Sequence, residues 1–87
     1  MQVQLRLFAN LREILPGDPL EHRGRTSLEV PADMNVQQLL DQLEIEPRMA
    51  QMLLVNGIQV ARKKSDRTRV KLSAGDVVSI FPPLAGG

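Results

Sequence analysis

Apolar and polar residues alternate over residues 3–7, which is the period of a β-strand with one buried face. On this alternation Phe8 falls on the outward, polar side. Asn10 then precedes apolar residues at helical spacing, which predicts a short capped helical turn. The polar residues 16–25 predict a loop, and residues 26–30 predict a second short strand. The first 30 residues are thus expected to form two strands joined by a turn and a loop.

The most regular helical pattern covers residues 36–43, where apolar residues recur at positions i, i+3, i+4 and i+7. Asn35 stands where a helix N-cap is expected, and Gln38 stands where a capping box needs its second partner. This segment predicts the main helix of the protein. Further along, Met49 and Met52 predict another helical turn whose side chains fill gaps in the core.

Asn56-Gly57 is the strongest turn signal in the sequence, because it separates the apolar runs 53–55 and 58–60 by two residues that tolerate positive φ angles. A β-hairpin with a type I′ turn is therefore predicted. Residues 77–81 predict the last strand. Two prolines follow it, and they end the strand because proline cannot donate to a sheet ladder.

These elements predict an α+β fold in which a mixed sheet of four to five strands packs on one main helix. If the first and last strands lie side by side at the centre, the topology is the ubiquitin-like β-grasp. We expect one domain over residues 1–81, followed by an extended, flexible Gly-Gly tail over residues 82–87. Beyond Phe81, this tail reaches about 20 Å when fully extended.

Composition excludes several kinds of chemistry. The chain has 87 residues, no cysteine and a single histidine, His22, so we expect neither a disulfide framework nor a zinc site. No apolar run reaches the ~18–20 residues that cross a bilayer, and the N-terminus does not resemble a secretory signal. We therefore expect a cytoplasmic protein with no membrane partner.

The net charge of +1 conceals a basic segment at residues 62–71, which holds six bases and one acid. Such a cluster could attract nucleic acid, whose binding would weaken steeply with salt. The segment has no interleaved aromatic residues for base stacking, however, and matches no nucleic-acid motif. We interpret it as a solvated loop that faces a partner, so nucleic acid is not the expected ligand.

The final heptapeptide, Phe81-Pro82-Pro83-Leu84-Ala85-Gly86-Gly87, closely resembles the terminus of the MoaD family, the small sulfur-carrier subunit of molybdopterin synthase. Other parts of the chain resemble the same family in the same order. They are Leu7-Phe8-Ala9 with Leu11-Arg12-Glu13, the helix at 36–43, Val55-Asn56-Gly57, and Leu72 with Gly75-Asp76-Val77. The loop 16–25 and the long basic stretch 62–69 depart from the family pattern.

The resemblance implies that the working group is the C-terminal carboxylate of Gly87. A ubiquitin-activating-like (MoeB-like) adenylyltransferase would use ATP to activate it, and a persulfide donor system would convert it to a thiocarboxylate. The larger synthase subunit, which is MoaE-like, would then use this sulfur for the dithiolene of molybdopterin. This chain would bind no cofactor or metal and would not be an enzyme, because the catalytic groups belong to its partners.

Partner binding is expected near the tail. Leu84, Ala85 and Gly86 would thread into a narrow tunnel, since glycine has no Cβ to obstruct it. The aromatic residues Phe8 and Phe81, the prolines Pro82 and Pro83, and Ile58 beside the hairpin turn are the candidate contacts with the large subunit. Phe81 is equally well interpreted as a core residue.

Three other functions stay open at this point. A sulfur carrier of this fold could serve thiamine thiazole synthesis, as ThiS proteins do, although Phe81-Pro82-Pro83 favours the pterin pathway. The chain could instead be a ubiquitin-like modifier that joins Gly87 to lysine amines of other proteins. Outside this class, a basic nucleic-acid-binding adaptor would tolerate loss of the tail.

Overall fold

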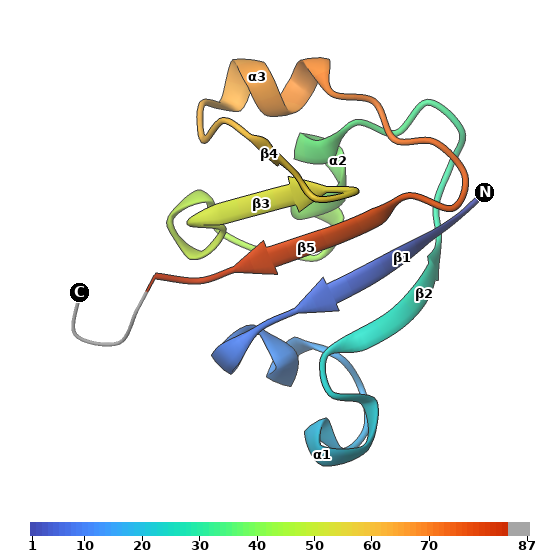
Figure 1. Cartoon of the computed structure of the whole chain (residues 1–87), viewed down its shortest axis with the longest axis vertical. Helices are drawn as coiled ribbons and strands as arrows, with labels where there is room; N and C mark the ends of the chain where they lie inside the picture. The colour runs from blue at the N-terminus through green and yellow to red at the C-terminus, as the bar shows by residue number, and fades with distance from the viewer. Residues whose placement is uncertain (84–87) are drawn as a thin grey trace.

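The computed structural model describes residues 1–83 of the chain. Its strands form one mixed five-stranded sheet in the order β2-β1-β5-β3-β4, with β1 and β5 parallel to each other at the centre (Figure 1). The other neighbouring strands are antiparallel, which confirms the predicted β-grasp topology. The strands are β1 (Gln2–Leu7), β2 (Arg25–Glu29), β3 (Met52–Val55), β4 (Ile58–Val60) and β5 (Val77–Phe81).

The core lies between one face of the sheet and the main helix. Val3, Leu5 and Leu7 point into it from β1, as the alternation predicts, and Leu39 and Leu40 enter it from the helix. Each such side chain contributes about 1.5–3 kcal/mol on burial. The helices of the described chain are α1 (Pro19–His22), α2 (Val36–Gln42), α3 (Lys64–Arg69) and the 3-10 helices η1 (Ala9–Ile14) and η2 (Pro47–Met49).

The start of the main helix, α2, has the predicted capping box. The backbone N–H of Gln38 donates to Asn35 Oδ1 at 2.8 Å, and the backbone N–H of Asn35 donates to Gln38 Oε1 at 2.9 Å. Both bonds satisfy N–H groups that have no partner within the first helical turn. The predicted capping box is therefore confirmed, with both of its hydrogen bonds present.

Two predictions about the region after β1 are wrong. The turn there is the 3-10 helix η1, which begins after Phe8, so Asn10 lies inside it and does not cap it. Within the predicted loop lies the short helix α1, whose N-cap Asp18 accepts a hydrogen bond from the backbone N–H of Leu20 at 2.9 Å. Asp18 followed by Pro19 is a helix-start signal that the polar character of the segment obscured.

The basic segment is also not a loop, because residues 64–69 form α3. Arg67 is only 1% exposed, and its Nη2 donates to the carbonyl oxygen of Ala50 at 2.7 Å. This contact fastens α3 to the body of the domain. A buried arginine in a polar sequence gives no apolar stripe, so the helical pattern was not visible from hydrophobicity.

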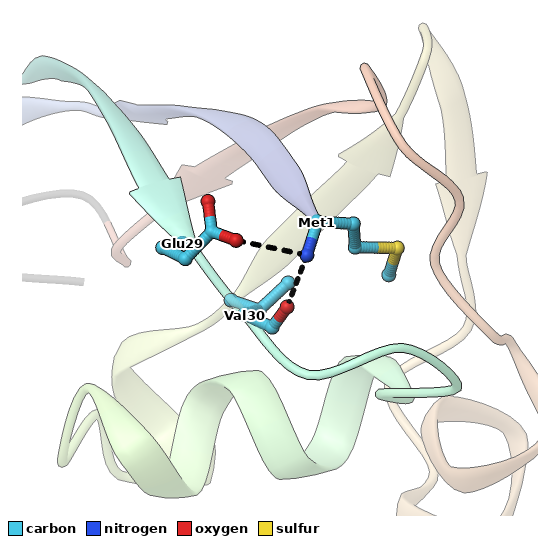
Figure 2. Close-up of polar contacts among 3 residues, drawn as sticks. All are labelled: Met1, Glu29 and Val30. Carbon is cyan, nitrogen blue, oxygen red and sulfur yellow. Dashed lines mark hydrogen bonds and ion pairs between the residues drawn. The ribbon is translucent and has the colours of Figure 1, made fainter.

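The central strand β1 is held at its start. The amino group of Met1 donates to Glu29 Oε1 at 3.1 Å and to the carbonyl oxygen of Val30 at 2.8 Å (Figure 2). These bonds tie the beginning of β1 to the end of β2.

Within residues 1–83, no helix is long and apolar enough to span a membrane.

Candidate functional site

The central strand β5 ends at Phe81 and carries the chain toward its C-terminus. β5 pairs with β1 on one side and with β3 on the other, so both flanks of the exit are fixed by hydrogen-bonded strands. In Figure 1, β1 and β5 point the same way and end at the same side of the sheet. Pro82 and Pro83 are half-buried just beyond this end. The predicted reactive and threading residues, Leu84, Ala85, Gly86 and Gly87, lie outside the described residues.

An aromatic stack marks the exit. Phe8 follows β1 and Phe81 ends β5, and their rings are stacked with centroids 4.1 Å apart and planes 9° from parallel. The backbone N–H of Phe8 donates to the carbonyl oxygen of Ile80 at 3.2 Å, which brings the two residues alongside each other. Such a pair contributes about 0.5–1.5 kcal/mol beyond the burial of its area.

Both rings lie on the face of the sheet opposite the core. Met52 stands opposite Phe81 on β3 and is 38% exposed, similar to Phe8 at 37%. We call these three residues, Phe8, Met52 and Phe81, the exit patch. Met52 was not among the predicted contacts; the predicted helical turn with a core side chain at this position is wrong, because Met52 begins β3 and is exposed. The buried neighbour Leu53 shows that Met52 must face outward, once the segment is recognised as a strand.

Two arginines lie beside the exit patch on the same face. Arg6 of β1 stands directly opposite Arg25 of β2, and both side chains are exposed. No carboxylate within residues 1–83 lies within salt-bridge distance of either. Directly opposed like charges destabilise a sheet, so the stability of the domain does not explain this pair.

Ile58 is separated from the exit patch. It pairs with Val55, whose side chain packs against the core, and therefore points to the helix-bearing face of the sheet. It is 74% exposed, but on the opposite face from Phe8 and Phe81. The structure thus brings Phe8, Phe81 and the prolines together and does not bring Ile58 to them.

A network at the other end of β5 fixes the position of that strand. The Asn56 side chain accepts from the backbone N–H of Val77 at 2.9 Å and donates to Asp76 Oδ1 at 2.9 Å. Asp76 Oδ2 also accepts from the backbone N–H of Ser73 at 2.8 Å. Asn56 and Gly57 have φ angles of 53° and 84°, as the predicted type I′ turn requires. Asn56 was predicted only as a turn residue, and this link to Asp76 was not predicted from the sequence.

The described residues offer a docking surface rather than catalytic groups. Within residues 1–83, no three His, Asp or Glu side chains converge as a metal site. Among residues 1–83, the one ionisable group with a clear shift is Arg67, whose pKa is lowered by burial and then by the positive charge of Arg62. Arg67 belongs to α3, away from the exit. The surroundings of β5 are therefore suited to holding a strand end and binding a partner.

Comparison with known proteins agrees with this arrangement. Residues 5–87 match the model of the ThiS family. The chain is 33% identical to small archaeal modifier protein 3 of Haloferax volcanii over the full length of both. The solution structure of the Haloferax volcanii HVO 2177 protein is similar with a TM-score of 0.72 at 30% identity, covering 100% of this chain and 87% of that one. A complex of subunits 1 and 2 of the molybdopterin-converting factor from Helicobacter pylori contains a similar fold, with a TM-score of 0.58 at 18% identity and full coverage of both chains.

Proposed function

This chain belongs to the ThiS family of ubiquitin-like sulfur carriers and modifiers, and from this premise we propose that it carries sulfur as a thiocarboxylate on Gly87 for molybdopterin synthesis. As a member of this family it is a non-catalytic carrier, and its partners supply the catalytic groups. The observation that carries the proposal is the exit at Phe81: a fixed central strand leads into the Pro-Pro-Leu-Ala-Gly-Gly terminus beside an aromatic stack.

The chemistry begins with activation, because a carboxylate is a poor electrophile. An ATP-dependent, MoeB-like partner would join the Gly87 carboxylate to AMP and release pyrophosphate. The terminal sulfur of a persulfide would then attack the acyl carbon, and AMP would leave. A second thiol of the donor system would supply the electrons that cleave the resulting acyl disulfide, leaving the thiocarboxylate. Because this group is more acidic than a thiol, it would be an ionised nucleophile at neutral pH.

Recognition by the partners would depend on the exit patch and the neighbouring arginines. Aromatic and arginine side chains are enriched among residues that dominate binding energy, and both are available here. Arg6 and Arg25 would meet an acidic surface, which also steers a partner during approach. We propose an activating enzyme and a MoaE-like large subunit as these partners. The Helicobacter pylori complex, in which a similar fold is bound to subunit 2, supports this choice.

The recipient of the sulfur is inferred from the tail. Phe81-Pro82-Pro83 resembles the pterin branch of this family more than the thiazole branch, so molybdopterin is the proposed product. A second function has specific support, because the relative that is 33% identical over its full length is named as a modifier. In that function the activated Gly87 would form an isopeptide bond with a lysine of another protein.

Co-purification followed by mass measurement separates these functions. The full chain, tagged at an exposed internal site of α1, would be recovered from its native cell, and its mass and its partners determined. A thiocarboxylate form bound to a large synthase subunit supports the proposal. Recovery with a thiazole-forming enzyme supports the thiamine branch, whereas isopeptide-linked conjugates support the modifier. If none of these forms accumulates when the activating enzyme is supplied, the proposal is wrong.

A further inference from the structure

A groove of about 490 Å³ runs between the hairpin and α3, on the helix-bearing side of the sheet. Figure 1 shows α3 lying over β4 at this edge of the molecule. The groove lies within the ~300–1,000 Å³ range of ligand-binding clefts. Its walls are mainly apolar, with Ile58 and Val60 from β4 and Val70 after α3, and Asp66 and Arg69 are its charged members. Ile58 is 74% exposed here, although it belongs to a strand.

One wall of the groove is an unpaired sheet edge. β4 ends the strand order, so it has a neighbour on one side only. Val55 and Ile58 flank the two-residue turn and form its hydrogen-bonded pair, which makes the next pair, Leu54 and Gln59, a non-hydrogen-bonded one. The backbone N–H and C=O of Gln59 therefore point away from β3, toward the open edge of the sheet. Within the described residues they have no hydrogen-bond partner on that side. They are available to an added strand.

The surroundings of the groove are positively charged. Arg62, Lys63, Lys64 and Arg69 are exposed around α3, and Asp66 is the single acid of residues 62–71. None of these bases forms a salt bridge within the described part of the chain. An acidic ligand would therefore gain from several unopposed cations, and its approach would be accelerated by their field.

We propose that this groove binds an extended segment of a partner protein in which apolar residues alternate and acidic residues flank them. The segment adds to the sheet beside β4, its backbone pairs with Gln59, and alternate side chains enter the apolar groove beside Ile58 and Val70. The acidic flanks meet the bases around α3. This is strand addition at a sheet edge, in which backbone bonds give affinity and pockets give selectivity.

The groove chemistry favours a peptide over nucleic acid. Its floor is aliphatic, and the two aromatic residues of the chain, Phe8 and Phe81, lie on the opposite face of the sheet, where they cannot stack bases bound at α3. A segment in the groove also leaves the exit patch free. The chain can therefore hold this partner and a partner at its C-terminus at the same time.

The test uses the full chain and a fluorescein-labelled peptide of nine residues, in which three valines alternate with two polar residues and two glutamates stand at each end. Fluorescence anisotropy measures binding, and ¹⁵N–¹H spectra locate it. We expect shifts at Ile58, Gln59, Arg69 and Val70. Methylating the backbone nitrogens that face β4 should abolish binding without changing the charge of the peptide.

Substitutions test the two kinds of contact separately. Ile58→Glu and Arg69→Glu should each weaken binding by about tenfold or more. Leu20→Glu and Arg48→Glu make the same changes of charge at exposed sites outside the groove. They should change the affinity for the peptide by less than about twofold. Deleting Gly87 should leave peptide binding unchanged, so the result is independent of the proposed sulfur chemistry.

The proposal fails if the peptide does not bind, if the methylated peptide binds equally well, or if the shifts map to the exit patch. A fluorescein-labelled oligouridylate provides the competing case. If it alone shifts these resonances, with an affinity that falls steeply with salt, the groove is an RNA site and the peptide proposal is overturned.

Discussion

Phe8 and Phe81 are 73 positions apart in the sequence, yet their rings stack at 4.1 Å. The contact exists because β1 and β5 are parallel neighbours that end at the same side of the sheet. The two stacked rings lie at the end of β5, where the chain leaves the sheet. The stack therefore connects the fold to the proposed function, since it fixes the base of the segment that leads to the proposed reactive end.

The first prediction concerns this stack. Phe81→Ala should lower the free energy of unfolding by about 2–3 kcal/mol, because it removes a half-buried ring and its stacking partner. Phe8→Ala should cost less, because that ring is more exposed. Urea denaturation of both variants and of the double variant should give a coupling energy of about 0.5–1.5 kcal/mol. Strictly additive effects would show that the stack contributes nothing.

The second prediction concerns the link between the hairpin and β5. Asn56→Gly keeps the positive φ of the turn but removes the side-chain bonds to Asp76 and Val77. We expect a loss of about 1–2 kcal/mol. A double-mutant cycle with Asp76→Ala should show coupling above about 0.5 kcal/mol. Independent effects of the two substitutions would contradict the proposed link.

Gly24 carries the third prediction. Its φ is +74°, and a Cβ at this position would lie 2.0 Å from the carbonyl oxygen of Leu7. Gly24→Ala should therefore destabilise the domain by more than about 2 kcal/mol. Gly75→Ala is the matched control, because Gly75 has a similar φ of +85° but open space around its Cβ. Its cost should be about 1 kcal/mol, and equal melting temperatures for the two variants would refute the steric argument.

The fourth prediction separates packing from charge at Arg67. Arg67→Ala should cost about 2–4 kcal/mol, because it leaves a cavity and removes the donor to Ala50. Arg67→Met should cost clearly less, since it keeps most of the volume and removes a buried charge. Arg69→Ala, at an exposed site on the same helix, should change stability by less than about 0.5 kcal/mol. Thermal denaturation checks the order, and equal losses for alanine and methionine would contradict it.

The pH dependence of Arg67 follows from the sign of its shift. Because burial lowers its pKa in the folded state, the charged form is the one that folding disfavours. The resulting cost is fully present below the folded pKa and is relieved only as the pH rises through that value. At neutral pH the difference between arginine and methionine should therefore not depend on pH.

Local patterns in the sequence were sufficient to predict much of the fold. Alternation over 3–7, the Asn35 capping box and the Asn56-Gly57 turn each act within a few residues, and all three are confirmed. The helix α3 escaped prediction, because the residue that fastens it is a buried arginine rather than an apolar side chain. Its stability comes from a carbonyl group 17 positions away, which no local pattern contains.

The site was also predictable only in part, because some of its features depend on contacts between residues that are distant in the sequence. The assignment of the reactive end to residues 84–87 stays a prediction, because they lie outside the described residues, whereas the outward position of Phe8 is confirmed. The inclusion of Met52 and the exclusion of Ile58 depend on strand register, which places one on each face of the sheet. A shift of one residue along β3 would exchange the two faces, so pairing had to be known before the patch could be defined.

The central claim is that the carboxyl carbon of Gly87 is the reactive atom. The most direct test incubates the chain with its activating enzyme, ATP and a persulfide donor, and then measures the intact mass. We predict a gain corresponding to one oxygen-to-sulfur exchange, and no gain for a chain that lacks Gly87 or ends in an amide. Equal sulfur uptake by the truncated or amidated chain would contradict the account.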